Sequence, residues 1–303
     1  MKYFSVLSLS AIIFLFIPGN PSYCIELPEK PPVAFVSIGA EFSSGSYKTE
    51  STTRRAYIPL VVGWYPLERL DLSVELPFIF QNSSAVPASM STTAKTVARG
   101  PGSGAGIHTA IPSGTASTST VPTNSVLTNS VPTYSNASTR ASSVSGLGDI
   151  ILRGGYILLF EDNFMPQLRT SMLVKTPTAS VSEGLGTGEF DIGGGLDLSK
   201  WFGDLRLAGE AVYNYQGKVA GWGLKNYLNY SGTAGYQVTK KIQPMLVVNG
   251  ATASSVYSDD LLEVRGRLFW NLAQTTDVDL FASRGISKSS PDYSGGIAVI
   301  YSF

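Results

Sequence analysis

The stretch Asp260-Leu-Leu-Glu-Val-Arg-Gly-Arg-Leu-Phe-Trp-Asn-Leu272 decides the fold, because apolar and charged residues alternate along it. A period of two residues is that of a β-strand, whose successive side chains point to opposite faces. One face carries Glu263, Arg265 and Arg267, and the other carries leucine, valine and tryptophan. The stretch therefore predicts a strand with one charged face and one apolar face.

Segments of the same kind fill the chain on both sides of this strand, and turn-forming residues separate them. A helical period is not sustained anywhere among them. Each segment has roughly the 9–11 residues that a tilted strand needs to cross a lipid bilayer. The twelve predicted strands cover 34–45, 55–65, 70–80, 148–160, 166–177, 188–200, 204–215, 225–237, 241–252, 260–272, 277–286 and 294–303.

The breaks between the segments alternate between short turns, such as Thr239-Lys240, and longer loops, such as 216–224. Outer-membrane barrels have short periplasmic turns and long external loops, and an even strand count leaves both termini in the periplasm. We therefore predict an all-β fold, a transmembrane antiparallel up-and-down β-barrel of about 12 strands with one long disordered external loop.

A soluble β-sandwich is the alternative, because its strands alternate as well. It gives no reason for aromatic residues to gather in two bands, whereas aromatic girdles mark both rims of a membrane barrel. If the odd-numbered strands run outward, the periplasmic rim collects Trp64, Tyr156, Trp201, Tyr236, Trp270, Tyr301 and Phe303. The external rim then collects Phe78, Phe80, Phe190, Tyr213, Tyr215 and Tyr230.

Residues 1–24 have the layout of a secretory signal peptide, with Lys2 followed by an apolar run that peaks at 11–17. Its removal would leave residues 25–303 as an outer-membrane β-barrel without cysteine, which excludes disulfide and thiol chemistry. Export of this kind predicts a location in the bacterial outer membrane. A lipid anchor on Cys24 is the weaker alternative, since Pro21-Ser-Tyr23 lacks the usual aliphatic-then-small pattern.

Residues 82–145, between the third and fourth predicted strands, are rich in serine and threonine and contain no Asp or Glu. Such a segment cannot build a core, so it is predicted to be a low-complexity external loop. The loop is either a solvated insertion or a segment with a display, adhesive or pore-covering role. Both possibilities stay open.

Charge and histidine content exclude several classes of function. Lys+Arg and Asp+Glu both number 22, so electrostatic capture of nucleic acid is not expected. The single histidine, His108, lies in the Ser/Thr-rich loop, which argues against His-dependent hydrolysis and multi-His metal sites. We predict no catalytic residue, no metal and no cofactor, and an enzyme is the least favoured reading.

The charged face of the strands predicts a polar lumen, because charges are costly on a lipid-facing wall. Two readings stay open: the charges pair across neighbouring strands and rigidify the wall, or they form a field that filters solutes. A constriction is predicted toward the external half, where Lys175, Arg169 and Arg153 would face Asp149, Glu189 and Asp191. The predicted lumen and constriction residues are Asp149, Arg153, Arg169, Lys175, Glu189, Asp191, Arg206, Glu210, Glu263, Arg265 and Arg267, with Asp71, Glu75, Asp197 and Asp279 beside them.

The last strand, Gly295-Gly-Ile-Ala-Val-Ile-Tyr-Ser-Phe303, ends on an aromatic residue. Val299, Tyr301 and Phe303 alternate on its outward face. This pattern resembles the signal that the barrel-assembly machinery reads, so that machinery is a predicted partner during biogenesis.

Several motifs resemble the outer-membrane "meta-pathway of phenol degradation" family of transporter-like β-barrels. They are Gly146-Leu-Gly-Asp-Ile150, Val174-Lys-Thr-Pro-Thr178, Gly186-Thr-Gly188 with Asp191, Ser199-Lys-Trp-Phe-Gly203 and the terminal Phe303. The resemblance implies passive uptake of small molecules, aromatic ones among them. Ala179 stands where the family has glycine after Pro-Thr, and the 82–145 insertion is a larger departure.

These observations predict a porin-like barrel that lets small solutes diffuse across the outer membrane. Its partners would be outer-membrane lipid and the small-molecule solutes themselves. The alternative is a non-conducting structural or surface-display barrel whose Ser/Thr-rich loop mediates contacts.

Overall fold

The computed structural model describes residues 32–47, 52–82, 91–93, 126–128 and 143–303, and within them the chain is all β. Part of the described chain forms a small two-stranded pair, β4 (Ser91–Thr93) with β5 (Val126–Thr128). The other strands are β1 (Ala34–Gly45), β2 (Thr53–Leu67), β3 (Leu70–Gln81), β6 (Val144–Leu147), β7 (Ile151–Leu159), β8 (Gln167–Lys175), β9 (Asp191–Phe202), β10 (Leu205–Tyr215), β11 (Tyr227–Tyr236), β12 (Ile242–Ala251), β13 (Leu261–Ala273), β14 (Thr276–Gly285) and β15 (Tyr293–Ser302).

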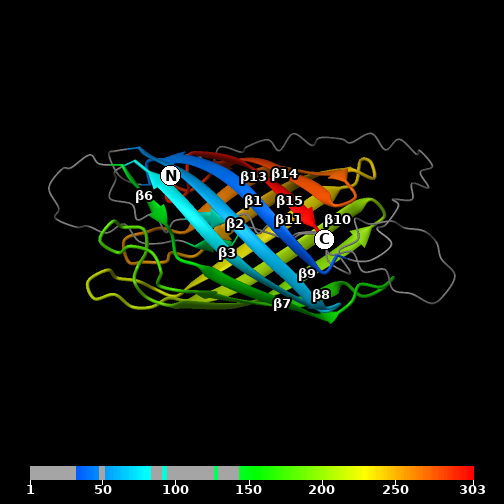
Figure 1. The fold of residues 1–303 in the computed structure, drawn as a ribbon, viewed down its shortest axis with the longest axis horizontal. Coiled ribbons are helices and arrows are strands. Elements are labelled where there is room, and N and C mark those ends of the chain that lie inside the picture. Colours follow the sequence, from blue (N-terminus) through cyan, green and yellow to red (C-terminus); the bar gives the residue numbers. More distant parts are fainter. Residues whose placement is uncertain (1–31, 48–51, 83–90, 94–125, 129–142) are drawn as a thin grey trace, which may run out of the picture.

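These strands close into one antiparallel barrel, in which strands next to each other in sequence are also neighbours in space. The circle closes between the first and last strands, where Phe35 lies opposite Ser302. Strands β6 and β7 both pair with β3 and together supply one position of the wall, so the described strands form a twelve-position barrel. Figure 1 shows the strands running obliquely around it. The predicted fold class is confirmed.

The barrel wall has the two faces that alternation predicts, but the apolar face is the outer one. On β10, Leu205, Leu207 and Tyr213 are exposed, whereas Arg206 and Asn214 point inward and are buried. A soluble barrel would bury the apolar face, whereas a barrel wall against lipid exposes it. Within the described residues no helix is long and apolar enough to cross a membrane.

The predicted aromatic bands lie on this outer face, with one exception. Trp64, Trp270 and Tyr301 are exposed on it, as are the residues predicted for the other band. The prediction for Trp201 is wrong, because its side chain points into the barrel and is buried. Inward residues of β9 have odd numbers, as Asp197 and Ser199 do, and position 201 continues that row.

The two ends of the barrel differ. At one, here called the turn end, short connections join β2 to β3, β9 to β10 and β13 to β14. Both ends of the described chain lie there, since Phe303 accepts hydrogen bonds from the backbone N–H groups of Val33 and Ala34 at 2.9 and 3.0 Å. The opposite end, the loop end, carries the longer connections, including 176–190, 216–226, 252–260 and 286–292.

A bulge interrupts the wall between β6 and β7. Residues 148–150 lie opposite only two residues of β3, Leu76 and Pro77, and proline has no N–H for a ladder bond. The Gly148 N–H donates instead to the Pro77 carbonyl at 2.8 Å. The bulge turns Asp149 into the barrel, where it is buried.

The predicted strands agree with the observed ones to within a few residues, except at this bulge. The fourth predicted segment, 148–160, is two strands and begins earlier, at Val144. The predicted signal peptide, 1–24, and most of the predicted 82–145 loop lie outside the described residues.

Candidate functional site

The candidate site is the lumen, and its charged side chains form separate groups at different heights. In the middle of the barrel, Arg153 on β7 contacts Glu75 on β3 at 2.6 Å, and the Tyr57 hydroxyl on β2 donates to the same carboxylate. Both charges are buried. Three neighbouring strands are thereby joined through one carboxylate.

Nearer the turn end, Arg169 on β8 binds two carboxylates at once. Its guanidinium contacts Asp71 on β3 at 2.7 Å and Asp197 on β9 at 2.8 Å. The planar fork of arginine suits such double pairing, because each carboxylate meets its own N–H groups. Arg169 thus bridges strands that flank it on both sides, reaching over β7 to Asp71.

A third group lies on β13 and β14. Glu263 accepts from Arg265 and from Asn249 on β12, both at 2.9 Å, and Arg267 pairs with Asp279. The Arg265 guanidinium also lies 4.0 Å from the centre of the Phe281 ring, a cation–π contact. Arg267 and Asp279 pair across two strands, as one of the two sequence-based readings expects, whereas Glu263 and Arg265 pair within β13.

The fourth group lies at the loop end and holds the motif residues. The Lys175 ammonium, at the end of β8, lies 2.7 Å from Asp191 and 3.4 Å from Asp149, and it donates to the Thr187 hydroxyl at 3.1 Å. Asp191 also accepts the Gly217 N–H at 3.0 Å. Buried carboxylates need such partners, since an unpaired buried charge costs several kcal/mol (roughly 3–5).

The connection 176–190 folds inward over this group. Leu185 is 1% exposed and packs with Ala179 against Tyr57 of β2 and Ile79 of β3. The Ala179 N–H donates to Asp149 at 3.0 Å. The connection between β8 and β9 therefore reaches across β7 to the inner faces of β2 and β3, and covers part of the lumen at the loop end. We call residues 176–190 the inward loop.

Gly186 in the inward loop allows a close approach that a side chain would prevent. A Cβ atom there would lie 2.8 Å from both carboxylate oxygens of Asp149 and 2.7 Å from the Ala179 Cβ. The contact with Asp149, which belongs to the motif Gly146-Leu-Gly-Asp-Ile150, thus explains the glycine at position 186 of the motif Gly186-Thr-Gly188.

Replacing Gly186 with alanine should therefore lower the free energy of unfolding by about 1–3 kcal/mol, because the inward loop must shift away from Asp149. Urea unfolding in detergent micelles measures this. Gly232→Ala is the matched control, since a Cβ there meets nothing within 4 Å. If both variants keep the wild-type midpoint, the contact with Asp149 does not constrain the loop.

The motif Ser199-Lys-Trp-Phe-Gly203 lies at the turn end, where it stabilises the turn between β7 and β8. Lys200 on β9 contacts Glu161 at 3.7 Å, and the Trp201 N–H donates to the same carboxylate at 2.8 Å. Two backbone N–H groups, of Met165 and Phe164, donate to Asp162 and hold the pKa of its carboxyl below the ordinary value. Gly203, which ends the motif, has a φ of +62° in the tight turn to β10.

An apolar group also faces the lumen, toward the turn end, and the sequence did not predict it. Phe269 on β13 packs against two clusters of buried side chains and joins them. The clusters consist of Phe35, Val61, Tyr65 and Ile300, and of Trp201, Met245 and Val247. We call these eight residues the apolar belt. The alternation along each strand places these residues on the inner face, and this was the signal in the sequence that could have predicted the belt.

The prediction of a single constriction is wrong, because the residues assigned to it do not form one group. Lys175 does contact Asp149 and Asp191, but Arg169 and Arg153 bind other carboxylates at other heights. Arg169 and Lys175 lie six residues apart on one strand, a separation of roughly 20 Å. Glu189 is also misplaced: it is exposed and precedes β9.

The remaining predicted lumen residues, Arg206 and Glu210, are buried on the inner face of β10. The Arg206 guanidinium lies 5.9 Å from the Trp201 ring centre. The sequence-based prediction also omitted three inward-facing charged residues that follow the same alternation: Glu41, Arg55 and Asp277. Within the described part of the chain, no three His, Cys, Asp or Glu side chains are grouped closely enough to hold a metal ion.

Several solved structures are similar to the chain. The KdgM porin is 7% identical, with 89% of this chain and 99% of that chain covered and a TM-score of 0.47. The translocator domain of the autotransporter NalP from Neisseria meningitidis is 11% identical, with 91% of each chain covered and a TM-score of 0.46. The CymD monoaromatic hydrocarbon channel is 11% identical, with 91% and 90% covered and a TM-score of 0.40.

Among curated proteins no sequence matches the chain. A family model described as "Putative MetA-pathway of phenol degradation" matches residues 100–303. That range includes β6 to β15, the inward loop with its Lys175 group, and the motif residues whose contacts are given above. The chain belongs to this family.

Proposed function

We propose that this protein is an outer-membrane barrel through which small solutes pass by diffusion. One observation carries the proposal: the strands form a closed wall that is apolar outside and charged inside. A closed barrel satisfies every backbone group without leaving a sheet edge, which is the condition for spanning a bilayer with strands. Because the outer membrane is where such barrels occur in bacteria, the proposal includes that location and export to it.

The lipid-facing part of the proposal predicts a large effect for a charge at the middle of the outer face. Leu196 lies at the centre of β9 and is 54% exposed. Leu196→Arg should lower the free energy of unfolding by about 2–4 kcal/mol in lipid vesicles, because a cation there meets hydrocarbon. Reversible urea unfolding in vesicles measures this.

Leu196→Ala is the matched control, since it shortens the same side chain without adding a charge. On a water-facing surface, Leu196→Arg would change stability by no more than about 0.5 kcal/mol. A change that small in vesicles would contradict a lipid-facing wall.

The proposed solutes are small and neutral, with aromatic compounds included. Two features of the lumen support this choice. The charges described above are held in ion pairs, which weakens their attraction for an ion, although seven carboxylates share five cations because Arg169 and Lys175 each hold two. The apolar belt lines the lumen, and its partly buried Phe269 ring gives a planar solute an aromatic side chain to stack on. The family description, which concerns phenol degradation, points the same way.

The experiment is planar-bilayer conductance combined with liposome swelling, on the refolded chain and on a chain lacking residues 83–142. The proposal expects uptake of small neutral aromatic compounds to exceed uptake of a sugar of similar mass in both proteins. Impermeability of both proteins to every solute would contradict it.

The display barrel remains the second candidate, because the sequence of residues 82–145 is unusual for a connecting loop. For a display barrel we expect binding to cells or surfaces. This binding should disappear when residues 83–142 are deleted, while the barrel stays folded. No catalytic residue is proposed in either case.

A further inference from the structure

Charged residues on the outer face of the barrel are few, and all of them are cations. In the described strands, every Asp and Glu points inward, and the outward-facing charges are Lys200, Arg54 and Arg284. Lys200 lies at the turn end, where it contacts Glu161 and the backbone of that turn. Arg54 and Arg284 both lie at the loop end.

The two arginines belong to one row that crosses four adjacent strands. Arg54 on β2 lies opposite Ser44 on β1, Ser44 lies opposite Tyr293 on β15, and Tyr293 lies opposite Arg284 on β14. Adjacent strands are spaced by about 4.8 Å, so the two arginine backbones are roughly 14 Å apart. The Arg284 guanidinium lies 5.2 Å from the Tyr293 ring centre. We call these four residues the arginine row.

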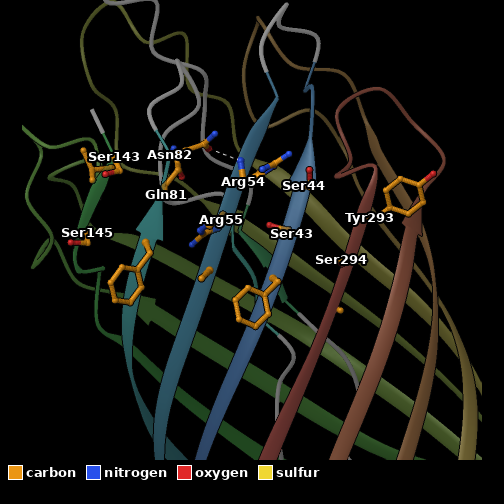
Figure 2. Close-up of a pocket in the computed structure, with 15 residues that line it drawn as sticks. Ser43, Ser44, Arg54, Arg55, Gln81, Asn82, Ser143, Ser145, Tyr293 and Ser294 are labelled. Carbon is orange, nitrogen blue, oxygen red and sulfur yellow. Dashed lines mark hydrogen bonds between the residues drawn. The ribbon is translucent and has the colours of Figure 1, made fainter. Parts of the chain in front are cut away.

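An apolar surface lies directly below the arginine row, toward the middle of the barrel. Phe42 and Phe80 are exposed there, and the small residues Ala56 and Gly295 lie in register beside Phe42. A cavity of about 630 Å³ spans this surface and reaches Arg54, Ser44 and Tyr293 (Figure 2). Most of its lining faces outward, including Phe42, Ala56 and Phe80, and the inward Arg55, Gln81 and Ser294 of the same strands also border it. Most of the cavity therefore lies on the outer side of the wall.

An arginine in this position needs an anionic neighbour. Cations on a lipid-facing wall are costly within the hydrocarbon and become tolerable near the headgroups. At that depth the available anions are the phosphates of lipids, which arginine binds through paired N–H groups. The aromatic and small residues below the row, Phe42, Phe80, Gly295 and Ala56, form an apolar surface of the kind that suits acyl chains.

We propose that the arginine row binds the phosphorylated headgroup of an outer-leaflet lipid whose acyl chains lie in the cavity below. The inference rests on the membrane location proposed above but not on conduction. A free phosphate ion would satisfy the arginines alone. The apolar cavity directly beneath them favours an amphiphile.

The test measures lipid binding to the full chain in a neutral detergent by native mass spectrometry. The probes are a diphosphorylated glycolipid of the lipid A type, the same lipid with its phosphates removed, and inorganic phosphate. The expected result is retention of the diphosphorylated lipid, weaker binding of the dephosphorylated lipid by roughly tenfold or more, and no displacement by millimolar phosphate.

Arg54→Gln and Arg284→Gln should each weaken binding by roughly tenfold, because each removes one set of charge-assisted hydrogen bonds. Lys200→Gln is the matched control, an outward cation at the other end, and should bind as the wild type does. Heat-modifiable migration on a gel checks that each barrel is folded, and Arg54→Lys keeps the charge if Arg54→Gln does not fold.

Equal binding of the phosphorylated and dephosphorylated lipids would overturn the proposal. So would wild-type binding by the Arg54→Gln, Arg284→Gln double variant. Displacement of the lipid by inorganic phosphate would show an anion site without a lipid preference, and would overturn it as well. A barrel that conducts nothing but retains the phosphorylated lipid would contradict the proposed function and leave this inference standing.

Discussion

Replacing Arg169 with methionine should lower the free energy of unfolding by about 3–5 kcal/mol, one of the largest losses expected for any single change in this barrel. Arg169 is buried and pairs with Asp71 and Asp197, at 2.7 and 2.8 Å. Methionine fills part of the space but leaves two carboxylates without their partner in the lumen. The cost is the desolvation of these charges, which pairing with Arg169 no longer offsets.

Urea unfolding of the refolded protein in vesicles measures this loss. Lys200→Met is the control, because the Lys200–Glu161 pair at 3.7 Å is partly exposed and should contribute less than about 1 kcal/mol. Equal, small losses for both variants would show that water reaches Asp71 and Asp197 freely. The triple replacement of Arg169, Asp71 and Asp197 by apolar residues should recover most of the loss.

Replacing Lys175 with methionine should release the inward loop rather than unfold the barrel. Lys175 holds Asp149 and Asp191 together, and Asp149 in turn accepts the Ala179 N–H of the loop. Without the ammonium, the two carboxylates face each other in a buried site, at a cost of about 3–5 kcal/mol. Opening of residues 176–190 lets water reach both carboxylates, while the ladders of β8 and β9 stay paired.

Hydrogen exchange detects this local opening. The amides of Ala179 and Leu185 should exchange about a hundredfold faster or more in Lys175→Met, because exchange follows the free energy of local opening. Amides in β12 should keep their wild-type rates. Lys225→Met is the control, since Lys225 is an exposed lysine in a neighbouring loop-end connection. Unchanged exchange at Ala179 would mean that Leu185 alone holds the loop.

The same variant informs the proposed function. The inward loop covers part of the lumen at the loop end, so its release should raise single-channel conductance, by about twofold or more if the loop limits passage. A conductance equal to that of the wild type, with the loop open by hydrogen exchange, would place the narrowest point elsewhere. The apolar belt around Phe269 is then the next position to alter.

The wall of the barrel could be predicted from the sequence because period-two alternation is a local property. Leu261–Ala273 shows it plainly, and the predicted and observed bounds of this strand differ by one residue at each end. The sequence also predicted which face of the wall points outward, since a lipid environment inverts the usual burial of apolar side chains. Trp201 was misjudged because an aromatic residue fits either a girdle or a packed lumen.

The ion-pair partners could not be predicted, because they depend on register between strands. Arg169 reaches Asp71 over β7, and the bulge at 148–150 shifts which residues face each other there. The different heights of Arg169 and Lys175, however, follow from their spacing on one strand. The grouping of these two cations in one constriction was an avoidable error.

The inward loop was missed because loops are expected to be solvated. Its sequence did carry a signal: Leu185 is a large apolar residue between glycines, in a connection that the structure folds inward. Asp149 and Gly186 are far apart in sequence, and neither predicts the other without the fold. Both belong to motifs that resemble the same family, and that was the only link between them before the structure.

The seam between β1 and β15 has a consequence for how the barrel forms. Neighbouring strands elsewhere follow one another along the chain, with the long 82–143 segment between β3 and β6, and can pair as soon as both have been delivered. The seam instead pairs residues from opposite ends of the barrel sequence, such as Phe35 with Ser302. Contacts of such long sequence separation form late and slowly. Until they form, the sheet has two open edges, one of them carrying Ile297, Val299 and Tyr301, and an open apolar edge invites pairing with a second chain. A chain truncated before Tyr293 should therefore aggregate rather than form a smaller barrel, because its remaining edge has no partner.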